Sequence, residues 1–419
     1  MSRRLNRPQS RIAAAVAVVA LAGGLSAVGP AVAARAPAAR ARLASATPSI
    51  TGSYRPPRIR HVWIIMLENR SAQYTYGPPG RRLAPYLAKT LRSKGAFLPD
   101  YYSTGHDSLD NYVAAVSGQA SNYELGQDCG LYANFNQFSG ENFDKFTKYG
   151  QLSGEGCVFP RYIKTVSQQL SQRGLTWKAY MQDMGNDPGR DGTVATRHGP
   201  ACGHPAVQTR DKTDSTAPRI DSYATRHNPF MYFHWIIDQR AYCAAHVVSL
   251  RPLAGDLRRI STTPDYSWIS PNTCDDGHDI PRCQDGQRGG LPRVNDFLKR
   301  WIPRIMNSTA YRQNGLIVII TDESGHDTNA TACCGEEDGL GFDDPSHPNM
   351  NEPGLYGPGG GRVGAVLLSK YIRPGTVSTR DYNHYSLMRS VEDLFGLAHL
   401  GDAQQPQVHS FGPDVYTRR

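Results

Sequence analysis

The stretch Tyr101–Gln119, YYSTGHDSLDNYVAAVSGQ, is the one around which the rest of the sequence can be arranged. It begins with aromatic residues typical of a strand, crosses the polar turn Gly105–Ser108, and continues as a helical run in which Tyr112 and Val116 can pack. A serine hydroxyl in the first turn of a helix faces unpaired N–H groups and the positive end of the helix dipole, where an oxyanion or phosphate binds. Taken alone, Ser108 is more simply explained as a helix N-cap. A functional role for Ser108 is favoured because polar turns with carboxylates or histidines also follow later predicted strands.

Two apolar runs predict strands at the centre of a sheet. His61–Leu67 and Gly315–Thr321 are continuously apolar, as expected of strands that are covered on both faces in a mostly parallel sheet. Functional groups in open α/β sheets lie just past the carboxyl ends of strands. Glu68–Asn69 and Asp322–Glu323, which follow the two runs, are therefore candidate ligands of a hard divalent cation. The alternative at each position is an ordinary polar turn.

The remaining pattern alternates strands with helices. Further strands are predicted at Thr176–Tyr180, Asp265–Ser270 and Val363–Ser369, and helices at Leu83–Arg92, Tyr162–Gln172, Asn295–Ile305 and Tyr385–Phe395. This alternation predicts an α/β fold with a mostly parallel central sheet flanked by helices. Residues 121–160, 183–222 and 325–361 lack periodicity and are interpreted as long loop insertions, the first of them on the surface.

Two histidines lie in turns that could face the same site. His227 stands just before Asn228-Pro229, and a residue near a proline tends to be extended or in a turn. His278 belongs to the acidic turn at 271–279, PNTCDDGHD, which follows a predicted strand. Either histidine could be structural instead, and the acidic turn is compatible with a solvated loop as well as with a ligand cluster.

The N-terminal residues predict export. Residues 1–33 start with basic residues, continue with the apolar run Ile12–Val28 and end in Ala31-Val32-Ala33, the small-x-small cleavage pattern of a secretory signal peptide. The apolar run is too short and too rich in alanine to be a good membrane anchor. Residues 34–57 have the composition of a disordered linker. The protein is expected to be secreted, and Arg3-Arg4 leaves both the Sec and the twin-arginine routes open.

The chain contains eight cysteines, an even number that indicates disulfides in an oxidising compartment. Proximity along the chain suggests the pairs Cys129–Cys157, Cys202–Cys243 and Cys274–Cys283. The pairing of Cys333 and Cys334 is left open. None of the spacings is that of a zinc knuckle.

The charge of the chain is mildly basic. Removal of residues 1–33 would delete four arginines and no acid, which would lower the formal net charge from +9 to +5. Such an excess can favour anionic lipids or phosphorylated substrates, but no block of Lys and Arg is dense enough to indicate nucleic acid binding. The sequence has neither a Walker-type phosphate loop nor a dinucleotide-binding fingerprint.

Several segments, in this order, resemble one family. They are the strand ending in Glu68-Asn69-Arg70-Ser71, HDSLDNY at 106–112, HNPF at 227–230, WISPNTCDDGHD at 268–279, TDES at 321–324, GGRVGAVLLSKYIRPGTVS at 360–378 and YNHYSLMRSVEDLFGL at 382–397. From about His61 to Leu397, the chain resembles the bacterial phosphoesterase family of secreted acid phosphatases and phospholipases C, within the alkaline phosphatase-like superfamily. The resemblance implies one phosphoesterase domain at residues 58–402, followed by a C-terminal tail at 403–419.

The resemblance also implies a metal-dependent hydrolase that forms a phosphoserine intermediate. Ser108 would be the nucleophile, and the site would comprise the cation ligands Glu68, Asn69, Ser108, Asp322 and Glu323 and the phosphate or leaving-group contacts His106, Asn111, His227 and His278. The divalent cation is left open among Ca²⁺, Mg²⁺, Mn²⁺ and Zn²⁺. Relatives often have proline at positions 107 and 110. An inward-facing Asp110 would repel a phosphate, so its side chain is expected to point outward.

Three functional hypotheses follow. The leading one is a secreted acid phosphatase, a phosphomonoesterase acting on small-molecule phosphate esters. The first alternative is a phospholipase C that cleaves the head-group phosphodiester of a phospholipid, with at most transient contact with a membrane surface. The second is a non-catalytic extracellular binding protein that has kept the fold.

Overall fold

The computed structural model describes residues 54–137, 146, 149–213, 221–278, 280, 282–283, 285–325, 331–335 and 359–418. The predicted signal peptide, most of the predicted linker and most of the predicted insertion at 325–361 lie outside these residues.

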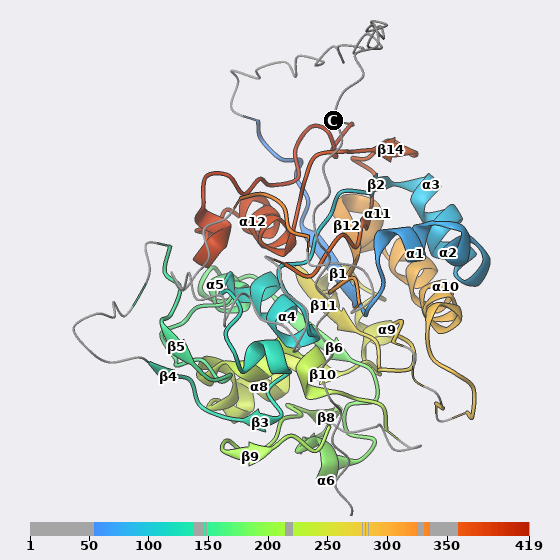
Figure 1. The fold of residues 1–419 in the computed structure, drawn as a ribbon. Coiled ribbons are helices and arrows are strands. Elements are labelled where there is room, and N and C mark those ends of the chain that lie inside the picture. The colour runs from blue at the N-terminus through green and yellow to red at the C-terminus, as the bar shows by residue number, and fades with distance from the viewer. Residues whose placement is uncertain are drawn as a thin grey trace, which may run out of the picture. The chain divides into compact units, whose positions relative to one another are not determined.

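A ten-stranded sheet forms the centre of the fold (Figure 1), with the strand order β14-β2-β13-β12-β1-β11-β6-β10-β8-β7. Strands β1 (His61–Leu67) and β12 (Gly315–Thr321) pair in parallel along their full length and have the bounds that the apolar runs predict. Strands β11 (Tyr266–Ser270), β6 (Trp177–Met181) and β10 (Val247–Ser249) extend the parallel part. The predicted mostly parallel sheet is thus confirmed at its centre.

The outer strands introduce antiparallel pairs. On one side β13 (Ala365–Ser369) runs antiparallel to β12 and to β2 (Ala96–Leu98), which pairs in parallel with β14 (Thr376–Val377). On the other side β8 (Gly199–Ala201) runs antiparallel to β10 and to β7 (Val194–Thr196). Two small sheets pair β3 (Leu131–Tyr132) with β9 (Thr209–Arg210), and β4 (Asn136–Gln137) with β5 (Gly154–Glu155).

Helices cover both faces of the sheet, and the side chains of β1 alternate between the two. Its residues 62, 64 and 66 share a hydrophobic cluster with α4 (Ser108–Ser117) and α12 (His384–Phe395). Its residues 63, 65 and 67 share another with α10 (Leu291–Asn307) and α11 (Thr309–Asn314). Figure 1 shows α4 and α12 on one side of the central strands and α10 and α11 on the other.

The other helices are short. They are α1 (Ala72–Tyr76), α2 (Pro78–Leu83), α3 (Arg92–Lys94), α5 (Val166–Gln172), α6 (Pro188–Asp191), α7 (His234–Ile237), α8 (Arg240–His246) and α9 (Leu253–Asp256). The single helix predicted at Leu83–Arg92 is instead a π-helical segment, Tyr86–Leu91, which begins directly after Pro85. Within the described ranges, none of the helices has both the length and the apolarity that crossing a membrane requires.

The first predicted insertion is less superficial than expected. Within 121–160, Leu125, Tyr132 and Phe159 are buried and belong to the cluster that contains α4. This segment is rich in aromatic residues, and burying them removes a large apolar area from water. The structure forms all three predicted disulfides and also joins Cys333 to Cys334.

Candidate functional site

Ser108 is the first residue of α4, and its hydroxyl contacts the end of β1. Its Oγ donates a hydrogen bond to Oε2 of Glu68 at 2.9 Å, and both side chains are buried. The preceding residue, Asp107, has φ 66° and makes no side-chain cap hydrogen bond, so the helix begins abruptly at Ser108. The chain thus brings together a hydroxyl and a carboxylate that lie 40 residues apart in the sequence.

The start of α4 is capped by a carboxylate from another loop. Oδ1 of Asp128 accepts hydrogen bonds from the backbone N–H of Ser108 at 3.0 Å and of Leu109 at 2.9 Å. Its other oxygen lies 3.2 Å from Nε of Arg226. The expectation of unpaired N–H groups at the start of this helix is therefore wrong for Ser108 and Leu109, because a negative charge already occupies the positive end of the dipole. Sequence reasoning missed Asp128, whose loop has no periodicity.

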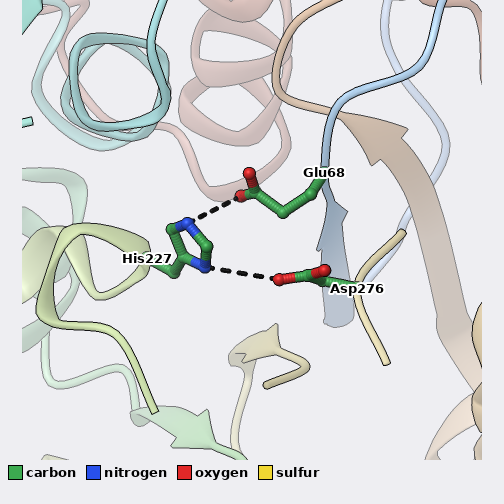
Figure 2. A group of neighbouring side chains, drawn as sticks. All are labelled: Glu68, His227 and Asp276. Carbon is green, nitrogen blue, oxygen red and sulfur yellow. Dashed lines mark ion pairs between the residues drawn. The ribbon is translucent and has the colours of Figure 1, made fainter. Parts of the chain in front are cut away.

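A buried group of three side chains adjoins the serine (Figure 2). Nε2 of His227 lies 3.3 Å from Oε1 of Glu68, and Nδ1 lies 3.5 Å from Oδ2 of Asp276. They come from a 3₁₀ turn (Thr225–His227), from the end of β1 and from the acidic turn after β11. One ligand atom from each residue lies within 4.8 Å of the others, which is close enough for all three to hold one metal ion.

The hydrogen bonding of this group fits a cation. Neither ring nitrogen of His227 makes a hydrogen bond with a described residue, and neither do Oδ2 of Asp276 and Oδ2 of Asp322. Buried polar atoms nearly always have a partner. A divalent cation would bind one of the two ring nitrogens together with the carboxylates of Glu68 and Asp276, so the residues present fit a metal site. The sequence analysis placed Asp276 in a possible ligand cluster but did not single it out.

The electrostatics point the same way. Burial raises the pKa of Asp276 and of Asp322 well above the usual carboxyl range, and the charge of Glu68 raises both further. Burial also lowers the pKa of His227 well below its ordinary value, helped by the positive charges of Arg226 and His278. His227 is therefore a neutral imidazole, the form that coordinates metals. Figure 2 shows the ring of His227 between the carboxylates of Glu68 and Asp276, with one ring nitrogen directed toward each.

Tyr112 completes the surroundings of Glu68. Its hydroxyl donates to Oε1 of Glu68 at 2.6 Å, and its ring stacks on His227 with centroids 5.4 Å apart. The sequence analysis treated Tyr112 only as a packing residue. Its spacing of four residues from Ser108 on one helix was the available signal, because such residues lie on the same face.

Asn69 and Glu323, two of the predicted ligands, are hydrogen-bonded to each other. Nδ2 of Asn69 donates to Oε1 of Glu323 at 2.5 Å, and Nδ1 of His106 lies 2.6 Å from Oε2 of the same carboxylate. This pair also adjoins the first group, because the backbone N–H of Asn69 donates to Oδ1 of Asp322 at 3.0 Å and the charge of Glu323 raises the pKa of Asp322. The predicted ligand roles of Asn69 and Glu323 stay predictions.

A family model supplies the wider context. The model of the phosphoesterase family matches residues 80–398, well over half of the chain. The chain belongs to the phosphoesterase family. Glu68 and Asn69 precede the matched range, while Ser108, His227, Asp276 and Asp322 lie within it.

Individual proteins match this phosphoesterase at low identity. An acid phosphatase of Aspergillus fumigatus is 21% identical over 316 residues, or 75% of this chain and 51% of that protein. A phosphate-repressible acid phosphatase of Penicillium chrysogenum is 21% identical over 311 residues, or 74% of this chain and 54% of that protein. The chain spans about half the length of these relatives. A solved structure of an alkaline phosphatase superfamily protein from Vibrio parahaemolyticus aligns with a TM-score of 0.44 and 13% identity, covering 84% of this chain and 71% of that one.

In this phosphoesterase, the side-chain amide of Asn111 makes its hydrogen bonds with residues of its own turn. Its Oδ1 accepts hydrogen bonds from Thr104 and from the Gly105 N–H, and its Nδ2 donates to Gly105, Asp107 and Asp110. The amide therefore holds the turn that presents Ser108. The predicted contact between Asn111 and phosphate stays a prediction.

The neighbouring Asp110 does not face solvent as expected. Its side chain is buried, and Oδ1 accepts from the backbone N–H of Asn111 at 2.6 Å. Burial raises the pKa of this carboxyl well above its usual range. The protonated form is thereby favoured, and it would not repel a phosphate.

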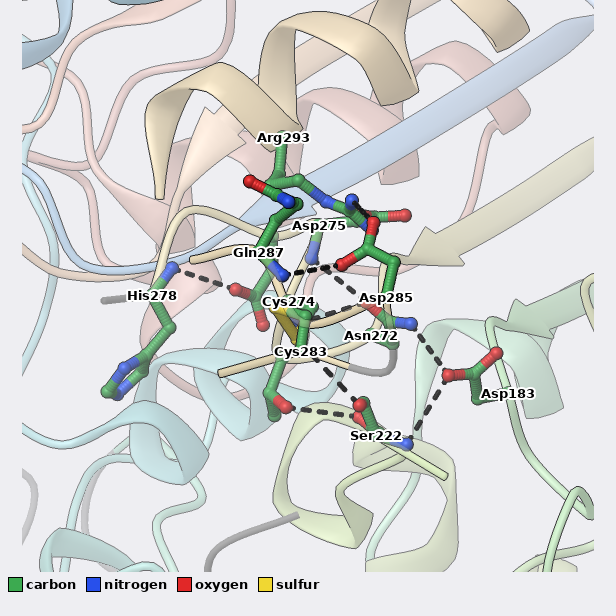
Figure 3. Close-up of a disulfide and its surroundings, with 12 residues drawn as sticks. Asp183, Ser222, Asn272, Cys274, Asp275, His278, Cys283, Asp285, Gln287 and Arg293 are labelled. Atoms are coloured by element: carbon green, nitrogen blue, oxygen red, sulfur yellow. Dashed lines mark hydrogen bonds and ion pairs between the residues drawn. A yellow bond between two sulfur atoms is a disulfide. The ribbon is translucent and has the colours of Figure 1, made fainter. Parts of the chain in front are cut away.

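The acidic turn after β11 is held close to β1. The backbone N–H of Glu68 donates to the carbonyl of Asp276 at 2.9 Å. Gly277 has φ 121°, and a Cβ there would lie 2.8 Å from the Glu68 carbonyl, so this close approach requires glycine. The predicted disulfide Cys274–Cys283 closes the turn, and the ring of His278 points away from the disulfide (Figure 3).

His384, whose role the sequence left open, lies behind the site. It is fully buried, with Nε2 2.7 Å from the carbonyl of Asp322 and Nδ1 3.1 Å from the hydroxyl of Tyr101. Burial lowers the pKa of His384 to about 4. Its contacts support the backbone of Asp322 rather than reach into the site.

Proposed function

We propose that this protein is a secreted, metal-dependent phosphoric ester hydrolase of the acid phosphatase type, acting on phosphate monoesters through a phosphoserine at Ser108. The observation that carries the proposal is the 2.9 Å hydrogen bond from the Ser108 hydroxyl to Glu68, beside the group formed with His227 and Asp276. Membership of the phosphoesterase family and the names of the fungal relatives support the chemistry. We also place the chain in the alkaline phosphatase-like superfamily.

In this proposal Ser108 Oγ attacks the phosphorus atom and passes its proton to Glu68, which already accepts its hydrogen bond. A bond forms between Oγ and phosphorus, and the bond from phosphorus to the ester oxygen breaks. Water then attacks the phosphoserine: its oxygen bonds to phosphorus as the bond from phosphorus to Oγ breaks, and its proton passes to the group that protonated the leaving alkoxide. Glu68 returns its proton to Oγ, which restores the hydroxyl as inorganic phosphate is released. Tyr112 and Asn111 orient the two ends of the first helical turn.

The leaving alkoxide requires a proton. His227 is a poor donor because burial keeps it neutral. We therefore assign proton donation to His278, whose charge is close enough to lower the pKa of His227. Glu68, His227 and Asp276, with Asp322 nearby, would hold the divalent cation. When bound, the cation supplies charge stabilisation to the phosphoryl oxygens and favours the serine alkoxide. The predicted ligand roles of Asn69 and Glu323 would then be indirect.

Secretion is supported by the four disulfides among the described residues, since such bonds persist in oxidising compartments. The predicted signal peptide at residues 1–33 would direct this export. Analysis of the mature N-terminus after expression in a secreting host tests this part of the proposal. Intracellular retention of the full-length chain would contradict it.

The test of the activity compares three substrates: p-nitrophenyl phosphate, bis(p-nitrophenyl) phosphate and phosphatidylcholine. We expect the monoester to be turned over fastest, and Ser108→Ala to lower kcat by about a thousandfold or more, as loss of a nucleophile does. Ser117→Ala, which removes a buried hydroxyl from the other end of the same helix, is the matched control and should keep kcat within about threefold. Faster turnover of the diester or the phospholipid would replace the phosphatase by a phospholipase C. No turnover of any ester would favour a binding protein.

A further inference from the structure

A second cavity lies at the carboxyl ends of β6 and β10. It has a volume of about 210 Å³, and its lining includes Gln182, Asp183, Ser249, Arg251, Arg300 and Trp301. Trp301 and the neighbouring Leu250 belong to the hydrophobic cluster on the α10 side of the sheet, whereas Ser108 begins the helix on the opposite side. Ligands of open α/β sheets bind beyond the carboxyl ends of strands, and this cavity has that position without containing any residue of the serine site.

Two arginines provide the charge. Arg251 and Arg300 are exposed residues of the lining, and neither forms an ion pair with any residue that the structure describes. Arg251 donates one hydrogen bond, to Oδ1 of Asn186 at 2.8 Å, which leaves further N–H groups for a ligand. Guanidinium groups bind phosphate and carboxylate oxygens in paired hydrogen bonds.

The lining contains one carboxylate, Asp183, which is hydrogen-bonded to residues outside the cavity. Oδ2 of Asp183 accepts hydrogen bonds from Nδ2 of Asn272 at 2.7 Å and from the backbone N–H of Ser222 at 3.3 Å, as Figure 3 shows. Its negative charge is thus directed toward neutral donors behind the cavity. The two arginines outnumber it, so the cavity has a positive balance.

From this combination we infer that the cavity is a binding site for a small oxyanion, either inorganic phosphate or the phosphate group of a small phosphoester. The phosphate oxygens are bound by Arg251 and Arg300. Leu250 and Trp301 supply an apolar wall for the remainder of an esterified ligand. The site is separate from Ser108 and does not depend on the proposed hydrolysis.

The cavity is linked to the serine site through one turn. Nε2 of Gln182 donates to Oδ2 of Asp275 at 2.7 Å, and Asn272 is held by Asp183. The same turn carries Asp276, which contacts His227. The cavity wall and Asp276 thus share one turn.

The test measures binding rather than turnover. Titration calorimetry of the metal-loaded full chain carrying Ser108→Ala, with inorganic phosphate and separately with glycerol 1-phosphate, gives the stoichiometry without hydrolysis. Adding Arg251→Gln and Arg300→Gln should remove one binding site or weaken it at least tenfold. The matched control adds Arg258→Gln and Arg259→Gln, two exposed arginines outside the lining, and should stay within about twofold.

The two ligands separate the two sources of the oxyanion. Binding of phosphate alone identifies free phosphate, and preferential binding of glycerol 1-phosphate identifies a phosphoester. Unchanged stoichiometry and affinity after Arg251→Gln and Arg300→Gln would overturn the proposal. Equal weakening in the control pair would also overturn it, because the effect would then reflect general surface charge. Unfolding midpoints of all variants show whether each is folded.

Discussion

At the scale of single residues, the site depends on how the first turn of α4 is held. Asp128 accepts from the two N–H groups at Ser108 and Leu109, so the anion-binding capacity of the helix end is already used by the protein itself. The residue next to this carboxylate, Cys129, is tied to Cys157 by a disulfide. Asp128 is therefore a positioning residue for the proposed nucleophile, in contrast to Glu68, which accepts a hydrogen bond from the Ser108 hydroxyl itself.

Replacing Asp128 should separate hydrogen bonding from charge. Asp128→Ala removes the acceptor, so we expect a loss of about 1 kcal/mol in unfolding free energy, typical of a lost helix cap, and a fall of about tenfold in kcat. Asp128→Asn keeps a carbonyl oxygen that can accept the same two hydrogen bonds. It should recover most of kcat while KM changes, because the local charge is altered. Steady-state kinetics on the monoester together with urea unfolding would decide, and an Ala variant with wild-type kcat would remove Asp128 from the site.

The site residues that could be predicted adjoin regular strands or helices, whereas those that could not lie in loops. Glu68, Asp322 and Ser108 stand directly beside strong strand or helix patterns, so their positions could be read from the sequence. Asp128 lies in a loop without periodicity, and only the tertiary fold places it at the helix end. Asp276 is one of several acids in a turn, and the sequence alone does not say which of them faces inward.

At the scale of the elements, the long buried strands were predictable and the edge strands were not. β1 and β12 are seven-residue apolar runs with burial on both faces, so their bounds follow from hydrophobicity alone. β7 and β8 have three residues each, too few for a periodic pattern. The antiparallel direction of β13 depends on how the chain returns to the sheet, which its apolar sequence does not encode.

Helix α12 contains a carboxyl group that should make stability depend on pH. Burial raises the pKa of Glu392 well above its usual range, and its Oε1 accepts from the backbone N–H of Leu400 at 3.0 Å. Above the ordinary carboxyl pKa of 4.5, the folded protein keeps a proton that the unfolded chain has lost. The unfolding free energy should therefore fall as pH rises, by about 1.4 kcal/mol per unit of pKa difference.

Glu392→Gln keeps the acceptor and removes the titration. We expect this variant to be more stable than the wild type at pH 8 and closer to it at pH 5, as measured by urea unfolding midpoints. Glu155→Gln, at an exposed position, should leave the pH dependence unchanged. Parallel pH profiles for the wild type and Glu392→Gln would show that this carboxyl ionises normally in the folded protein.

At the scale of the whole molecule, the proposed cation would join three segments that are distant in sequence. Glu68 directly follows β1, His227 is the last residue of a 3₁₀ turn, and Asp276 lies in the turn after β11. A ligand that binds only the folded state adds about 2.7 kcal/mol at a hundred times its dissociation constant. Chelation with EDTA should thus abolish activity and lower the thermal unfolding midpoint by a few degrees, and one of Ca²⁺, Mg²⁺, Mn²⁺ or Zn²⁺ should restore both.

The control for chelation is the double variant His227→Ala and Asp276→Ala. Its unfolding midpoint should not respond to EDTA, because two of the three residues proposed to hold the cation are gone. An equal shift in the variant and the wild type would place the responsible metal elsewhere in the molecule. No shift and full activity of the wild type in EDTA would mean that the chemistry proceeds without a bound cation.

The order of the strands has a consequence for how the protein is made. Of the strands that the structure describes, β1 leaves the ribosome first, yet its two neighbours in the sheet are β11 and β12, with His61 opposite Gly315 and Val62 opposite Tyr266. Seven consecutive buried residues must therefore wait, without their partners, until most of the polypeptide has been synthesised. An apolar strand in that condition is prone to self-association, so nascent chains stopped before residue 266 should be the species that molecular chaperones retain.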